Sequence, residues 1–128
     1  MIAGIGTDIV AIERMRSAWQ RHGEKLTSRI LTPNELSVFN SFRDNEVAFL
    51  ARRFAAKEAA AKALGTGFRD GVGLRSLEVC HDGHGKPELR LLDGAARRGE
   101  QLRISATYLS LSDEHDYAVA FVIMVAEV

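Results

Sequence analysis

The stretch that decides the fold is Arg-Arg-Phe-Ala-Ala-Lys-Glu-Ala-Ala-Ala-Lys-Ala-Leu-Gly-Thr-Gly-Phe, residues 52–68. Alanine has the best intrinsic helix propensity, and Gly65 supplies the left-handed residue that commonly ends a helix. The small side chains also let another backbone or a ligand approach the helix closely. The stretch therefore predicts the end of a long helix, spanning residues 46–64, followed by a glycine-containing loop.

The charged residues of this helix suggest a function. Glu58 and Lys62 lie one turn apart on one face, and Arg53 and Lys57 form a second, purely cationic pair on an adjacent face. A solvated helix with one ordinary Glu–Lys pair explains these charges and is favoured by the helix taken alone. In the alternative, the cations and the Gly-Thr-Gly loop hold phosphates while Glu58 binds Mg2+, which typically takes one or two carboxylates. That alternative needs a second carboxylate.

Composition limits the class of protein. The 128 residues, 46% hydrophobic and 27% charged, are ordinary for one globular domain over residues 1–128. Zero net charge, from 17 basic and 17 acidic residues, argues against a general nucleic-acid binder. The single Cys80 excludes an intrachain disulfide, and neither a signal peptide nor a membrane-spanning apolar run is apparent. We therefore expect a cytoplasmic protein that binds neither nucleic acid nor membrane.

Asp8 is the candidate for the second carboxylate. Residues 2–10 alternate as a strand does, which places Asp8 on the same face as Gly4 and Gly6. Glycines at alternate positions leave room for something to approach the backbone, and Asp8 lies where the strand gives way to a helix. Capping of that helix by Asp8 is an equally open interpretation.

A basic surface is predicted on the helix over residues 11–23. Its apolar residues Ile12, Met15 and Trp19 have the spacing of a buried stripe, so Arg14 and Arg21 point outward. Together with Lys25 and Arg29, the two arginines would suit docking of an acidic partner. Solvated surface charge is the commoner explanation of such residues.

The remaining patterns indicate the fold class. The sequence Thr32-Pro33-Asn34-Glu35 begins a helix with a capping box, and this helix should end near Phe42. Strands are expected at residues 77–81, 88–92, 103–111 and 117–125, with a short helix at residues 94–101. Helices followed by mostly antiparallel strands define an α+β protein, with the helices packed on the sheet.

Several common active sites are disfavoured. The four histidines lack partners at any zinc-ligand spacing, and Ser110 and Ser112 lie outside a Gly-x-Ser-x-Gly elbow. The chain has no Gly-x-x-x-x-Gly-Lys-Ser/Thr phosphate loop, and its Gly4-Ile5-Gly6 lacks the third glycine of a dinucleotide-binding fingerprint. Zinc sites, serine nucleophiles and conventional nucleotide folds are therefore unsupported.

The ordered motifs of the chain resemble those of a known family. They are Gly4-Ile5-Gly6-Thr7-Asp8, Arg53-Phe54-Ala55-Ala56-Lys57-Glu58-Ala59 with Lys62, Gly65-Thr66-Gly67, Gly85-Lys86-Pro87, and Ser110-Leu111-Ser112 with Tyr117-Ala118-Val119-Ala120. The first two are specific for the 4'-phosphopantetheinyl transferase superfamily, and the chain length is similar to that of its trimeric branch, the holo-acyl-carrier-protein synthases. Asp113 is a departure, because the family often has a histidine there, which would contact the 3'-phosphate of coenzyme A.

The resemblance implies Mg2+-dependent transfer of 4'-phosphopantetheine from coenzyme A to a serine of apo acyl carrier protein, in support of fatty acid biosynthesis. Asp8 and Glu58 would hold Mg2+ on the pyrophosphate, and Lys62 would add positive charge there. Glu58, directly or through a metal-bound water, would take the serine proton. The resemblance places further coenzyme A contacts at Arg53, Lys57, Gly65, Thr66, Gly67, Lys86 and Pro87, and the basic surface suits the carrier protein at Arg14 and Arg21.

Residues 117–125, which are almost continuously apolar, favour an oligomer. Both faces of such a strand need burial, and a small α+β domain covers one face with its own helices. The resemblance and this strand together predict a homotrimer with its sites between subunits, and a strand buried on both faces within one subunit is the alternative. A non-catalytic carrier-protein or nucleotide-binding module and a purely structural trimer are the rival functions.

Overall fold

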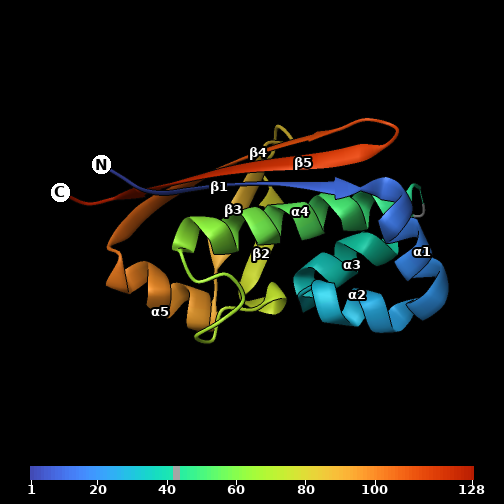
Figure 1. Ribbon diagram of the computed structural model, residues 1–128, viewed down its shortest axis with the longest axis horizontal. Coiled ribbons are helices and arrows are strands. Elements are labelled where there is room, and N and C mark those ends of the chain that lie inside the picture. The colour runs from blue at the N-terminus through green and yellow to red at the C-terminus, as the bar shows by residue number, and fades with distance from the viewer. Residues whose placement is uncertain (42–43) are drawn as a thin grey trace.

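The computed structural model describes residues 1–41 and 44–128 (Figure 1). An N-terminal strand and a run of helices come first: β1 (Ile2–Ala11), α1 (Ile12–His22), α2 (Glu24–Ile30), α3 (Pro33–Ser41) and α4 (Glu46–Leu64). The second half holds a 3-10 turn (Leu74–Ser76), β2 (Leu77–His81), β3 (Pro87–Leu91), α5 (Asp93–Gln101), β4 (Ile104–Asp113) and β5 (Tyr117–Ala126). The expected α+β class, with its long helix over residues 46–64, is confirmed.

The helical region after β1 consists of more than one helix. The sequence predicts one helix over residues 11–23, but β1 extends to Ala11 and a second helix, α2, follows α1 directly. Gly23, with a φ of 51°, separates the two helices because a positive φ interrupts the helical backbone. The predicted end of the third helix near Phe42 lies outside the described residues.

The strands form two antiparallel units. One is a three-stranded sheet with the order β1-β5-β4, in which Asp8 lies opposite Ala120, and the other is the hairpin β2-β3. Helix α4 runs along one face of the three-stranded sheet, with α1, α2 and α3 gathered at one end and α5 at the other (Figure 1). No helix within residues 1–41 and 44–128 has the length and apolar character that crossing a membrane requires.

Helix α4 packs against β1 at backbone distance. A Cβ atom added to Gly6 would lie 1.9 Å from the carbonyl oxygen of Ala59, and one added to Gly4 would lie 1.9 Å from that of Ala63. The room that the glycines leave on β1 is therefore filled by the backbone of α4, whose alanines are fully or almost fully buried.

The sheet has one buried face and one exposed apolar face. Ala118, Ala120, Val122 and Met124 of β5 face α4 and are completely buried. The opposite face carries exposed apolar side chains from all three strands, namely Ile5, Ile9, Tyr108, Tyr117, Val119 and Phe121. The expectation that this chain covers only one face of the 117–125 strand is confirmed.

We expect Gly6→Ala to destabilise the protein by about 1–3 kcal/mol or more, because its methyl group meets a backbone oxygen rather than a movable side chain. Gly83→Ala is the matched control, since nothing lies within 4 Å of a Cβ added there. Urea unfolding of both variants measures the difference. Equal unfolding midpoints would contradict the close packing of α4 on β1.

Candidate active site

Asp8 on β1 and Lys62 on α4 form an ion pair. The ammonium of Lys62 donates to Asp8 Oδ1 at 3.2 Å and to the carbonyl oxygen of Thr7 at 2.9 Å. The side chain of Asp8 is 17% exposed and that of Lys62 is 52% exposed, so the pair is open to solvent on the lysine side. The two hydrogen bonds leave the third donor of the ammonium available to a ligand.

Glu58 lies one helical turn before Lys62 and shares a hollow with Asp8. Burial and, secondarily, the negative charge of Asp8 raise the pKa of the Glu58 carboxyl, and the charge of Lys62 partly opposes this shift. The two carboxylates therefore interact unfavourably with each other, although they lie on different elements. A cation or a proton bound between them would relieve the repulsion.

The hollow that holds Asp8 and Glu58 has a volume of about 540 Å³. One wall comes from α1 and carries Arg14, and α2 contributes Arg29. Its apolar lining includes Val10, Met15, Ala18, Leu26, Phe54 and Leu74. Arg21 lies outside this hollow but shares a neighbouring shallow depression with Arg14. The structure thus brings the expected basic surface to the edge of the carboxylate site.

A divalent ion at this site would find two carboxylates, those of Asp8 and Glu58. Among the described residues there is no group of three or more His, Cys, Asp or Glu side chains arranged to hold a metal. Mg2+ commonly takes one or two carboxylates and completes its coordination with water and substrate phosphate oxygens. Asp8 and Glu58 fit that pattern, whereas a structural zinc site needs four ligands.

A second hollow, of about 410 Å³, lies at the C-terminal end of β2, where the turn to β3 begins. It is lined by Arg52, His81, Gly85, Lys86, Pro87, Leu109, Ser110 and Leu111, none of which lines the first hollow. The turn before β3 is held in shape by Asp82, whose carboxylate accepts the backbone N–H groups of His84 and Lys86. These two hydrogen bonds also lower the pKa of Asp82.

The second hollow, which Lys86 and Pro87 line, is not lined by Gly65, Thr66 or Gly67. Gly65 ends α4 with a φ of 78°, as expected for a left-handed cap. It lies roughly 20 Å along the helix axis from Arg52, which lines the second hollow. Thr66 is almost completely buried, and its hydroxyl donates to the carbonyl oxygen of Gly67. Within one chain the two segments therefore do not line one pocket.

Arg53 and Lys57 form part of a buried ionic cluster. The Lys57 side chain is completely buried and donates to the Glu35 carboxylate and to the Ile30 carbonyl oxygen. Arg53 Nε lies 3.3 Å from Glu35 Oε2, without the geometry of a hydrogen bond, and its guanidinium lies over the ring of Phe49. Burial lowers the pKa of Lys57, and Glu35 opposes that shift.

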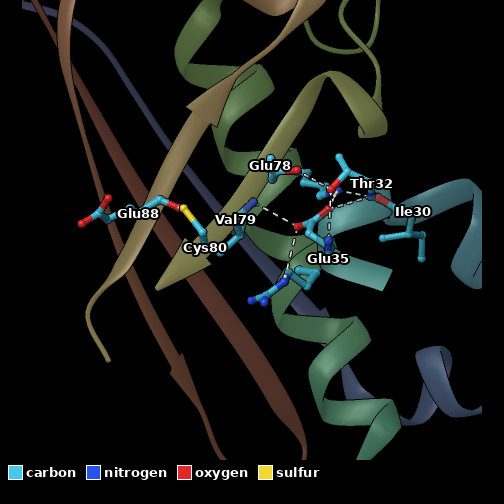
Figure 2. Close-up of polar contacts among 9 residues, drawn as sticks. Ile30, Thr32, Glu35, Glu78, Val79, Cys80 and Glu88 are labelled. Carbon is cyan, nitrogen blue, oxygen red and sulfur yellow. Dashed lines mark hydrogen bonds and ion pairs between the residues drawn. The ribbon is translucent and has the colours of Figure 1, made fainter. Parts of the chain in front are cut away.

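The expected cationic face of Arg53 and Lys57 is therefore wrong, because a buried carboxylate from α3 lies against both residues. Figure 2 shows Glu35 at the centre of these contacts, where it also accepts the backbone N–H groups of Thr32 and Val79, each at 3.0 Å. Lys57 has no exposed surface with which to reach a phosphate. The capping-box pattern predicted the Thr32 contact of Glu35, but its pairing with Lys57 depends on how α3 packs on α4.

The chain matches one protein family over nearly its whole length. The profile of the 4'-phosphopantetheinyl transferase superfamily matches residues 4–122. A holo-[acyl-carrier-protein] synthase from Halorhodospira halophila is 61% identical over 98% of each chain, and one from Vibrio cholerae is 50% identical over 97% of this chain and 98% of its own.

Solved structures give the same result. The crystal structure of the synthase from Neisseria meningitidis has a TM-score of 0.91 at 45% identity, covering 98% of this chain and 99% of its own. A Bacillus anthracis synthase in complex with CoA (3',5'-ADP) has a TM-score of 0.84 at 35% identity, with 99% of each chain covered. The chain belongs to the 4'-phosphopantetheinyl transferase superfamily. Within that superfamily its relatives are the holo-[acyl-carrier-protein] synthases.

We expect Glu35→Gln to destabilise the fold by about 3–5 kcal/mol, because it leaves the buried charges of Lys57 and Arg53 without an anionic partner. Glu13→Gln is the control, since Glu13 also lies 3.3 Å from an arginine but is 81% exposed. Chemical denaturation followed by circular dichroism compares the two. If both substitutions had the same small effect, the buried cluster would not stabilise the helix packing.

Proposed function

We propose that this chain transfers the 4'-phosphopantetheine group of coenzyme A to a serine hydroxyl of an apo acyl carrier protein and releases adenosine 3',5'-bisphosphate. The observation that carries the proposal is the meeting of Asp8 and Glu58, beside Lys62, in one solvent-open hollow. The names of the relatives, and the coenzyme A bound to the Bacillus anthracis and Helicobacter pylori synthases, support the same reaction.

Asp8 and Glu58 are the residues that we assign to Mg2+. When bound, Mg2+ would supply positive charge that stabilises the oxygens around the attacked phosphorus and on the leaving phosphate. The assignment is supported by the raised pKa of Glu58, which reflects burial and, secondarily, the negative charge of Asp8. Lys62 contributes a second positive charge, and its free N–H donor is available to a pyrophosphate oxygen.

Glu58 is also our candidate for the general base. Its carboxylate lies in the hollow that the serine would enter, where it could take the proton directly or through a metal-bound water. The serine hydroxyl of the carrier would approach from the side of the hollow lined by α1. Glu58 would then take the serine proton as the oxygen attacks phosphorus.

The carrier protein is placed against α1 in this proposal. Arg14 lines the carboxylate hollow and Arg21 lines the depression next to it, so a partner bound to both would deliver its serine to Glu58. Apolar residues of the same hollow, such as Met15 and Phe54, would contact the uncharged part of the partner or of the pantetheine arm. Arg29 extends the cationic edge.

We further infer that the working enzyme is a cytoplasmic homotrimer acting through one domain, residues 1–128. The exposed apolar face of the three-stranded sheet supports the oligomer, since a patch of that kind is commonly covered by a partner. The separation of the two hollows supports a composite site, in which one subunit offers Asp8 and Glu58 and another offers Lys86 and Pro87. The lone Cys80 fits a reducing compartment.

Neutral substitutions at the two carboxylates test the function. We expect Asp8→Asn and Glu58→Gln each to lower the rate of Mg2+-dependent transfer roughly 100-fold, because each removes one proposed metal ligand. Glu100→Gln, a neutralised exposed carboxylate on α5 that lines neither the carboxylate hollow nor the depression beside it, should keep the wild-type rate. Initial rates over a range of Mg2+ concentrations provide the measurement.

Two results would count against the proposal. Near wild-type turnover in either variant, with its Mg2+ dependence intact, would mean that the carboxylates do not hold the metal. A non-catalytic binding module predicts that coenzyme A or the carrier binds to the wild-type protein and that no modified carrier forms at any Mg2+ concentration.

A further inference from the structure

Lys57 is a cation that the transfer step does not use, and it lies directly behind the carboxylate hollow. Its side chain is completely buried, and it lines neither of the two hollows. Its ammonium donates to the Glu35 carboxylate and to the carbonyl oxygen of Ile30. Ile30 and the residue after Lys57, Glu58, both line the carboxylate hollow. Lys57 therefore joins two parts of that hollow's wall from inside the protein.

Two adjacent faces of α4 carry the hollow and the buried ionic cluster. Residues four apart share a face of a helix, so Phe54 and Glu58 lie on one face and Arg53 and Lys57 on the next. The first pair lines the hollow, whereas the second pair lies against Glu35. Successive side chains of a helix point about 100° apart. A lysine held at two acceptors therefore also fixes the direction of the glutamate that follows it.

The α2 wall of the hollow is bound by the same ammonium. Leu26, Arg29 and Ile30 of α2 line the hollow, and Ile30 is the last residue of this helix. The carbonyl groups of a last helical turn have no partner within the helix, and that of Ile30 is bound by Lys57 instead. Among residues 1–41 and 44–128, no other hydrogen bond joins α2 to α4. The separation between Glu58 and the α2 wall therefore depends on this bond as well as on apolar packing.

We propose that Lys57 is a positioning residue for Glu58. By binding Glu35 and Ile30 together, it sets the direction of the Glu58 carboxylate and the distance of that carboxylate from the α2 wall that carries Arg29. This inference rests on the proposed function, in which Glu58 holds Mg2+ and takes the proton of the carrier's serine. Lys57 has no exposed surface with which to touch ion or substrate, so it acts only through Glu58 and the α2 wall.

Lys57→Met is the variant that tests this role with the least damage to the fold. Methionine is also unbranched and adapts to irregular space, so it removes the two hydrogen bonds with little change in shape. Glu35 keeps the backbone N–H groups of Thr32 and Val79 and the nearby guanidinium of Arg53. An uncompensated buried charge is what makes a broken ion pair costly, and here the carboxylate still faces one cation. We therefore expect the variant to fold.

The affinity for Mn2+, a paramagnetic substitute for Mg2+, reports the position of Glu58 without relying on turnover. Bound Mn2+ is measured from the loss of the free-ion signal in electron paramagnetic resonance, with coenzyme A present. We expect Lys57→Met to weaken Mn2+ binding about tenfold, as is typical when a group that orients a metal ligand is removed. The kcat for transfer should also fall about tenfold, because a displaced base and metal ligand no longer match the reacting atoms.

Leu77→Ala is the matched control for lost stability. Leu77 is completely buried in the apolar cluster between α4 and the strands, whereas Ile30 belongs to a separate apolar cluster. It lines neither hollow. Loss of its contacts should lower the melting temperature, but the folded variant should keep the wild-type Mn2+ affinity and kcat. The wild type and both variants are compared well below their melting temperatures, at equal concentrations of folded chain.

Wild-type Mn2+ affinity and wild-type kcat in Lys57→Met would overturn the proposal, whatever the change in melting temperature, because Lys57 would then only hold the helices together. Equal losses in Leu77→Ala would overturn it as well, since they would follow from any loss of stability. If Lys57→Met does not fold, Lys57→Gln is the second variant and must show the same losses. Its shorter side chain keeps N–H donors but cannot reach both acceptors.

Metal binding and transfer, measured on the same proteins, separate this inference from the reaction. If the wild type binds Mn2+ but modifies no carrier, the proposed function is rejected, and weaker Mn2+ binding in Lys57→Met alone still supports the positioning role. If the wild type does not bind Mn2+ in the presence of coenzyme A, there is no metal position for Lys57 to set, and this inference is overturned.

Discussion

The contact between the backbones of α4 and β1 is the constraint on which the rest of the structure depends. Gly4 and Gly6 let the helix approach until the carbonyl oxygens of Ala63 and Ala59 occupy the space of the missing side chains. At that separation Asp8 on the strand and Lys62 on the helix are in hydrogen-bond contact, with Glu58 one turn away. A wider spacing would separate the two carboxylates and leave no common metal position.

The rotation of α4 about its axis is set from the opposite side by Glu35. Lys57 and Glu58 are adjacent in the sequence, and successive helical side chains point about 100° apart. Because Glu35 holds the buried Lys57, Glu58 is directed toward Asp8 and the solvent-open hollow. Glu35 also binds Val79 on β2, so the same carboxylate joins the helices to the hairpin that carries Lys86 (Figure 2).

Local patterns predicted the elements well, because alanine-rich helix, glycine cap and alternating strand are encoded by neighbouring residues. The α+β class, the helix over residues 46–64 and the exposure of one sheet face could all be inferred in this way. The glycine face of the strand singles out Asp8, but only the fold brings Asp8 into the same hollow as Glu58. Helix α2 was missed, because Gly23 joins two helices without a conventional loop.

Charge was the least predictable property of the chain. Arg53 and Lys57 read as a solvent-facing pair on a helical wheel, and only the packing of α3 shows that Glu35 neutralises them. The pair of Arg52 and Asp113 joins residues 61 positions apart, which no local pattern could indicate. The burial of such a pair, complete for Lys57 and partial for Arg52, distinguishes a core cation from one that a ligand can reach.

The intact mass of an apo acyl carrier protein, measured after incubation with the chain, coenzyme A and Mg2+, tests the central claim most directly. The account predicts that one phosphopantetheine group is added to the carrier, that chelation of Mg2+ prevents the addition, and that a carrier with alanine in place of its modified serine keeps its mass. An unchanged carrier mass in the complete mixture, or full modification in the presence of a chelator, would contradict the account.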